Sequence, residues 1–146
     1  MIVPDANLLL YAYDESFPDH AAARSWWEIV MNGDEPIGLP WVVILAFVRL
    51  ATHPTVAANP RSVPEVREIV ESWVAAPHVR VLHGTGQTMN AFFVALEGAK
   101  LGGNLCTDAM IAALAIEAGA RVFTNDRDFQ RFPGLIAVYP LRVNSR

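Results

Sequence analysis

Four aspartates occupy positions from which their side chains could form one acidic site. Asp5 follows the short apolar run at the start of the chain, and Asp126 and Asp128 follow a second apolar run at 121–124. Ligand sites of parallel sheets lie at the carboxyl ends of the strands, so these side chains can reach the same rim. Asp108 lies near the start of a helical pattern, on the apolar face that should pack on the sheet. Together they could place three or four carboxylates in one site.

Such a group of carboxylates favours metal chemistry. Clustered carboxylates repel one another, and a carboxylate facing a core is costly unless it is paired or bound to metal. No Lys or Arg lies within one helical turn of Asp108. Oxygen ligands suit Mg²⁺, and Mn²⁺ fits the same set. A bound ion of this kind acidifies a water and neutralises charge on phosphate oxygens, so the expected reaction is hydrolysis of a phosphodiester.

Each aspartate also has a purely structural interpretation. Asp5 with Asn7 could cap a helix, and Asp108 could be a first-turn charge favoured by the helix dipole. Asp126 and Asp128 could be ordinary turn residues. Taken singly these interpretations are favoured, and only the joint placement favours a metal site.

The rest of the chain alternates short β-branched runs with longer helical patterns. Strands are expected at 2–3, 37–39, 79–82 and 121–124, with an edge strand at 136–138. Helices are expected at 20–32, after the Ser62 capping box through Trp73, at 88–98, and between Gly103 and Gly119. The apolar segment 41–52 is either a helix or a buried strand followed by one.

This alternation predicts the α/β fold class. Strands separated by helices imply right-handed crossovers and a mostly parallel sheet covered on both faces. We therefore expect a three-layer α/β/α sandwich around about four to five strands.

The composition fits a single domain over residues 1–146. Hydrophobic residues make up 53% of the chain and charged residues 18%, which supplies a core and excludes intrinsic disorder. The net charge of −4 argues against a basic nucleic-acid surface, although acidic and basic residues are equal in number once the four aspartates are set aside. Any nucleic-acid affinity should therefore be modest and depend on a bound ion.

The location expected from the sequence is the cytoplasm. Cys106 is the only cysteine, so no internal disulfide forms and a reducing compartment is favoured. The N-terminus lacks the basic and apolar regions of a signal peptide. The most apolar stretch, 41–51, reaches Arg49 well before the ~20 residues of a membrane span.

Three segments resemble the PIN domain, and more narrowly the VapC-type toxins of bacterial toxin–antitoxin pairs. They read Ile-Val-Pro-Asp-Ala-Asn-Leu-Leu from residue 2, Asn-Leu-Cys-Thr-Asp-Ala-Met-Ile-Ala-Ala-Leu-Ala from residue 104, and Val-Phe-Thr-Asn-Asp-Arg-Asp-Phe from residue 122. The segments 38–41 and 47–52 are similar to the mycobacterial members.

This resemblance implies a PIN-like fold and a Mg²⁺-dependent endoribonuclease. Asp5, Asp108 and Asp126 would form the catalytic acidic site and hold the metal, with Asp128 as a fourth ligand. The implied partners are an RNA substrate, a small cognate antitoxin that blocks the site, and usually a second copy of the chain. Arg49, Arg127 and Arg131 are the basic residues that could guide RNA, although a surface ion pair is favoured for Arg127.

One position departs from the family pattern. Many members carry a glutamate on the helix that here reads Ile-Leu-Ala-Phe-Val-Arg from residue 44, and Phe47 stands near that place. Either Asp128 or Asp14/Glu15 substitutes for it, or the metal affinity is lower than usual.

The alternative function is a catalytically weak or inactive PIN-like module that acts mainly by binding proteins. Trp26 and Trp27 are adjacent and point ~100° apart on a helix, so both cannot face the same core. One of them is either an exposed anchor for a partner helix or covered by a second layer or a dimer interface.

Overall fold

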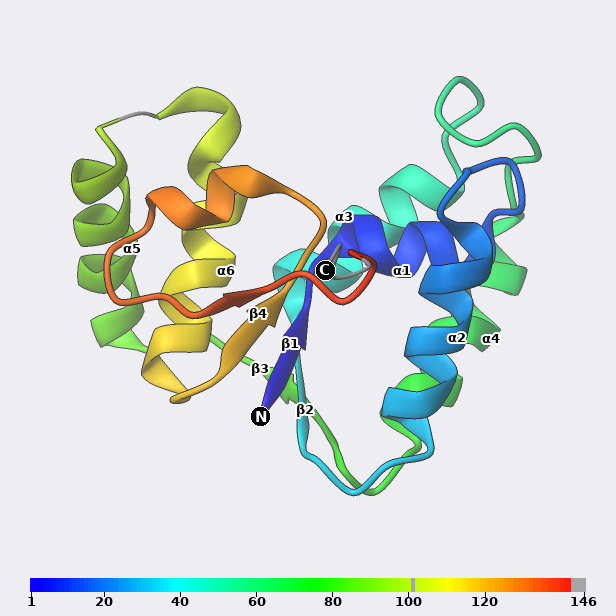
Figure 1. Ribbon diagram of the computed structural model, residues 1–146, viewed down its shortest axis with the longest axis horizontal. Helices are drawn as coiled ribbons and strands as arrows, with labels where there is room; N and C mark the ends of the chain where they lie inside the picture. The colour runs from blue at the N-terminus through cyan, green and yellow to red at the C-terminus, as the bar shows by residue number, and fades with distance from the viewer. Residues whose placement is uncertain (101, 143–146) are drawn as a thin grey trace.

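A computed structural model describes residues 1–100 and 102–142. Its centre is one sheet of five parallel strands in the order β3-β2-β1-β4-β5 (Figure 1). The strands are β1 (Ile2–Pro4), β2 (Ile37–Pro40), β3 (Val79–Leu82), β4 (Arg121–Phe123) and β5 (Ala137–Val138). The expected α/β class and parallel sheet are confirmed.

Helices lie on both sides of this sheet. They are α1 (Ala6–Tyr13), α2 (His20–Met31), α3 (Trp41–Ala51), α4 (Val63–Val74), α5 (Gly86–Ala99) and α6 (Cys106–Glu117), with 3-10 turns η1 (Gly103–Leu105) and η2 (Arg127–Arg131). Figure 1 shows α5 and α6 on one side of the sheet and α1, α2 and α4 on the other. In the part of the chain that the structure describes, no helix is long and apolar enough to cross a bilayer.

Local sequence signals account for most of the helix boundaries. The Ser62 side chain accepts from the Glu65 N–H in a capping box that opens α4, as expected. Helix α5 starts at Gly86, two residues before the expected start, because Thr85 rather than a later residue caps it. The segment 41–51 is helical throughout, which settles the alternative left open for it.

The core on the α1 side of the sheet is aromatic. The ring of Phe47 lies 4.8 Å from that of Trp73, and Trp27 packs edge-on to Trp73 at 5.6 Å. Trp26 is half-buried and stacks on Phe123 at 5.8 Å. Trp27 is therefore covered by the fold and Trp26 is covered in part, so neither ring is a fully exposed anchor.

Candidate active site

The acidic residues meet where the strand order of the sheet changes direction. The chain passes from β1 outward to β2 and β3, then returns to add β4 and β5 on the other side of β1. Asp5 follows β1 and Asp126 follows β4, and these two strands are paired in register. The Asp5 N–H donates to the Phe123 carbonyl at 2.8 Å, which joins the two strand ends. Such switch points are where open α/β sheets bind ligands.

The Thr124 hydroxyl links the Asp5 side chain to the backbone of Asp126. It donates to Oδ2 of Asp5 at 2.8 Å and accepts from the Asp126 N–H at 2.9 Å. Thr124 is fully buried and Asp5 is only 5% exposed, so this contact is shielded from water. From the sequence, Thr124 is expected only to end a strand. Its position between that strand and an acidic turn is the feature that could have predicted its contact with the aspartates.

Asp126 and Asp128 do shape a turn, as one interpretation of the sequence predicted. Oδ1 of Asp126 accepts from the Asp128 N–H at 2.8 Å and so caps η2. The Tyr139 hydroxyl donates to the Asp126 carbonyl at 3.2 Å and links β5 to the same turn. A structural role of this kind fixes the turn without removing Asp126 from the site.

Asp5 occupies the N-cap position of α1, but its side chain closes no capping hydrogen bond. Burial raises the pKa of Asp5, and the Asp126 carboxylate raises it further. The Thr124 hydroxyl and the nearby N–H groups of Ala6 and Asn7 oppose that rise. The Asp5 carboxylate is therefore placed by the strand edge rather than by a helix cap.

The pKa of Asp108 depends on the charges of the other three aspartates. Asp108 lies half-buried in the first turn of α6. Burial, followed by the charges of Asp5, Asp126 and Asp128, raises its pKa to about 7. Within residues 1–100 and 102–142, no Lys or Arg forms an ion pair with Asp5, Asp108 or Asp126.

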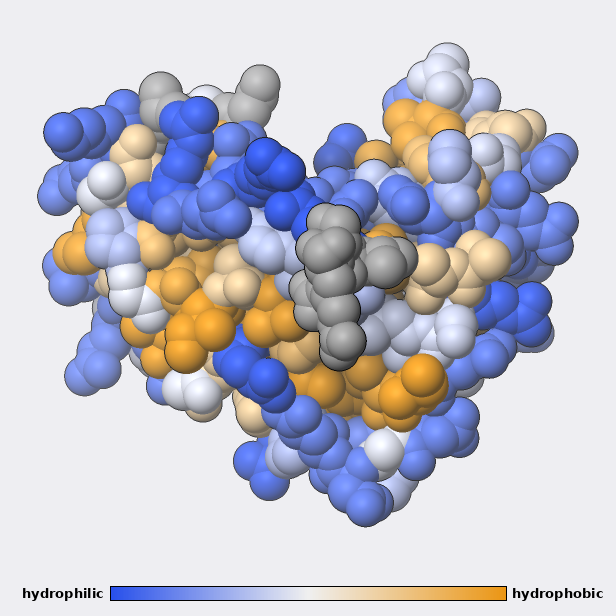
Figure 2. Space-filling model, viewed as in Figure 1, coloured by the Kyte–Doolittle hydropathy of each residue, from blue (hydrophilic) through white to orange (hydrophobic). Residues whose placement is uncertain are grey.

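The donor chemistry of this site fits a hard divalent cation. In the described part of the chain, no three His, Cys, Asp or Glu side chains are gathered closely enough to enclose a metal ion. Mg²⁺ does not require such a cage, because proteins usually bind it through one or two carboxylates and leave several waters in place. Figure 2 shows the molecule hollowed between its two lobes above the sheet, with hydrophilic residues along the border.

Comparison with known proteins identifies the fold. A model of the family described as the PIN domain matches residues 2–135. The chain belongs to the PIN-domain family. This PIN domain is 36% identical over 142 residues to Ribonuclease VapC33 of Mycobacterium tuberculosis, a match covering 97% of this chain and 99% of that protein. It is 37% identical over 137 residues to Ribonuclease VapC37 of the same organism, with 92% and 94% covered.

Solved structures give the same fold at lower identity. The PIN domain superposes on VapC20 of Mycobacterium tuberculosis, described as a sarcin-ricin loop cleaving toxin, with a TM-score of 0.71 at 15% identity, covering 93% and 97% of the two chains. It superposes on a chain of VapBC-1 from nontypeable Haemophilus influenzae with a TM-score of 0.67 at 18% identity, covering 97% and 100%. The expected resemblance is thereby confirmed.

The position expected to carry a glutamate in the PIN domain is part of the core. Phe47 is fully buried against Trp73. Asp14 and Glu15 follow the end of α1, about 12 Å of helix from Asp5, and cannot substitute. Asp128 is the one proposed substitute that acts on the pKa of Asp108.

The basic residues of the PIN domain are arranged differently from the expectation. Arg131 Nε pairs with Oδ1 of Asp128 at 3.2 Å. Arg127 is exposed and forms no ion pair with any described residue, so the surface pair favoured for it is not observed. Arg49 is exposed on α3.

Proposed function

We propose that this chain is the toxin of a toxin–antitoxin pair and acts in the cytoplasm as a Mg²⁺-dependent endoribonuclease. The observation that carries the proposal is that the ends of β1 and β4 bring Asp5 and Asp126 together at the switch point of the sheet, with Asp108 near enough for their charges to raise its pKa. The relation to ribonucleases VapC33 and VapC37 supports RNA as the substrate.

Asp5, Asp108, Asp126 and Asp128 would surround the ion, one or two of them as direct ligands and the others through its bound waters. When bound, a divalent ion supplies an acidified water and neutralises the charge that develops on the phosphate. The Thr124 hydroxyl orients the Asp5 carboxylate and holds the backbone of Asp126, while the Asp128 N–H holds the Asp126 carboxylate. Without a bound ion, burial and the neighbouring carboxylates raise the pKa of Asp108 to about 7, so a cation would compete with a proton for this carboxyl near neutral pH.

Cleavage of RNA by the purified protein tests this function. We expect single-stranded or looped RNA to be cut with Mg²⁺ or Mn²⁺, and EDTA to abolish the activity. Asp5→Ala and Asp108→Ala should each lose cleavage, since each removes a carboxylate from the site. Glu71→Gln neutralises an exposed carboxylate on α4 and is the matched control. Full cleavage by both aspartate variants would show that the site is assigned wrongly.

Expression in cells separates this function from the alternative. The toxin should arrest growth when expressed alone and be relieved by a small protein encoded beside it. Mapping new RNA 5′ ends after induction, with Asp5→Ala as control, would identify the RNA that is cut. Harmless expression of the folded protein, with no new ends, would instead favour the binding module.

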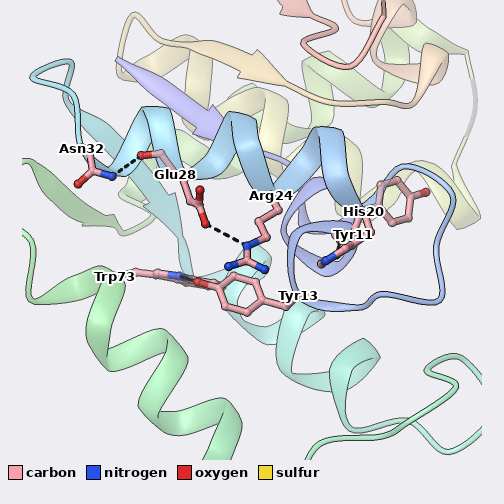
Figure 3. Close-up of polar contacts among 7 residues, drawn as sticks. All are labelled: Tyr11, Tyr13, His20, Arg24, Glu28, Asn32 and Trp73. Carbon is pink, nitrogen blue, oxygen red and sulfur yellow. Dashed lines mark hydrogen bonds and ion pairs between the residues drawn. The ribbon is translucent and has the colours of Figure 1, made fainter.

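The antitoxin is assigned to the cleft between α1, α2 and α4. The cleft has a volume of about 660 Å³, and its walls include Asp14, Trp27 and Arg61. Figure 3 shows Arg24 and Glu28 pointing from α2 across this cleft toward Tyr13 and Trp73. Solved structures with the same fold include VapBC toxin–antitoxin complexes from Rickettsia felis and Haemophilus influenzae.

Two buried polar atoms in the walls of the cleft indicate what the antitoxin supplies. Oδ2 of Asp14 and the indole N–H of Trp27 have no hydrogen-bond partner among the described residues. A partner segment that offers a donor to Asp14 and an acceptor to Trp27 would satisfy both. Asp14→Lys should therefore weaken the complex while the free toxin cleaves normally, and Glu71→Lys should leave the complex unchanged.

A further inference from the structure

An aromatic pair lies on the α1 side of the acidic site. The ring centroids of Tyr11 and Phe17 are 4.8 Å apart, and both side chains are half-buried. Most of the remaining side chains of α1 are buried, whereas Asn7 and Tyr11, one turn apart on the same face, stay partly open. Tyr11 stands about 9 Å of helix rise beyond Asp5. The open face of α1 therefore leads from the acidic site to this ring.

Hydrogen bonds fix the backbone at Tyr11 and the turn that follows α1. Nδ1 of His20 is bonded to the Tyr11 carbonyl at 2.7 Å. The turn between α1 and α2 is closed by the Phe17 N–H donating to the Asp14 carbonyl at 3.3 Å and the His20 N–H donating to the Phe17 carbonyl at 3.0 Å. Figure 3 shows the Tyr11 ring projecting away from Tyr13 and Trp73, and so away from the cleft assigned to the antitoxin.

The surroundings of Tyr11 favour an uncharged planar ligand. Burial raises the pKa of Tyr11, and the carboxylates of Asp19, Asp5 and Asp126 raise it further, so the phenol stays neutral. The Asn125 side-chain N–H donates to Oδ2 of Asp19 at 3.5 Å, so the Asp19 carboxylate lies on the same rim as the residues that follow β4. A phosphate is repelled here, whereas a base is not. Proteins that bind single-stranded RNA stack its bases on aromatic side chains.

We propose that Tyr11, backed by Phe17, stacks on the base next to the phosphodiester cleaved at Asp5, Asp108 and Asp126. Tyr11 is thus a substrate-binding residue that holds the nucleotide beside the cleaved bond, whichever base it carries. This inference rests on the proposed ribonuclease function and names the part of the RNA that this rim recognises.

Cleavage kinetics of Tyr11 variants test the contact. With a short RNA substrate and Mg²⁺, Tyr11→Leu should raise KM about tenfold, the scale of one lost base–aromatic stack, and leave kcat within about twofold. Tyr11→Phe should restore the wild-type KM, because the ring is kept. Ile29→Ala removes an exposed apolar side chain from α2, outside both the acidic site and the α3–α5 groove, and should have no effect on either constant.

A substrate lacking one base shows whether the ring touches RNA or only supports the fold. Removing the base on one side of the cleaved bond should cost wild-type enzyme as much as Tyr11→Leu does, and the two changes together should cost no more than either alone. An unchanged KM for Tyr11→Leu, additive losses, or failure of Tyr11→Phe to rescue would overturn the contact while the ribonuclease function stands.

Binding measurements separate the remaining outcomes. If the wild-type protein cuts no RNA, the proposed function fails. Labelled RNA that then binds wild type and Tyr11→Leu with equal affinity would overturn the stacking contact as well. Should Tyr11→Leu weaken only the complex with the antitoxin, the rim recognises protein rather than RNA, and the inference is overturned.

Discussion

At the scale of single residues, the site depends on one buried hydroxyl. Thr124 is both the donor to the Asp5 carboxylate and the acceptor for the Asp126 backbone N–H, so it holds Asp5 beside the turn that carries Asp126. No charged group performs this task among the described residues. A neutral hydroxyl positions the carboxylates without cancelling the charge that a cation needs.

Replacing that hydroxyl by a methyl group should remove the hydrogen bonds of Thr124 while keeping the shape of its side chain. Thr124→Val keeps the volume but leaves the Asp126 N–H unpaired and Asp5 without its donor, at a cost of about 1–3 kcal/mol in the free energy of unfolding. We expect cleavage to fall at least tenfold and Thr124→Ser to retain most of it. Urea unfolding and initial cleavage rates measure both effects. Thr52→Val, a half-buried threonine bonded within α3, is the control, and equal cleavage rates for both valine variants would contradict the role.

The raised pKa of Asp108 predicts a pH-dependent stability of the metal-free protein. Between its usual pKa near 3.8 and about 7, the folded carboxyl holds a proton that the unfolded one has lost. The folded state thus binds more protons, so the free energy of unfolding falls as pH rises through this window and levels off above it. In EDTA, Asp108→Asn should show a shallower decline of Tm between pH 5 and pH 7 than wild type. Parallel curves would contradict the coupling, and Glu71→Gln should follow wild type.

At the scale of elements, the sequence predicted those residues whose place depends on the order of the strands or on a short capping motif. The acids after β1 and β4 and the capping box of α4 could be placed from order and spacing alone. Helix α1 could not, because its apolar residues lie on nearly every face and give no helical period. The place of Phe47 could not be predicted either, because only its packing on Trp73 reveals that this position faces the core.

The capping box of α4 should matter for stability and not for cleavage. The Ser62 side chain accepts from the Glu65 N–H at 3.3 Å, and α4 lies across the antitoxin cleft from α2 rather than at the acidic edge. Ser62→Ala should lower the free energy of unfolding by about 1 kcal/mol, the usual cost of losing an N-cap. Thermal melts measure this loss. The cleavage rate of the folded enzyme should match wild type, and a slower rate would mean that α4 reaches the site.

At the scale of the whole molecule, one apolar face is left uncovered by the residues that the structure describes. Trp41 and Leu45 on α3 are 58% and 67% exposed, and Phe93 on α5 is 52% exposed. Trp41 and Phe93 line the same groove of about 750 Å³ between α3 and α5. The apolar surface that Figure 2 shows between β5 and α2 is a different one, on the face toward the viewer. None of the residues that line the groove carries a charged side chain, so a second copy of the same face would cover it without burying an unpaired charge.

Introducing a charge into this face should therefore produce a monomer. We expect the wild-type protein to form a twofold dimer at micromolar concentration, in which each Leu45 contacts the apolar groove of the other copy. Leu45→Asp buries an unpaired carboxylate in that contact and should halve the mass measured by light scattering while the far-UV spectrum is unchanged. Ile29→Asp places the same charge on the exposed surface of α2, outside the α3–α5 face, and should leave the dimer intact. A wild-type monomer, or a dimer that tolerates Leu45→Asp, would assign this face to a different partner.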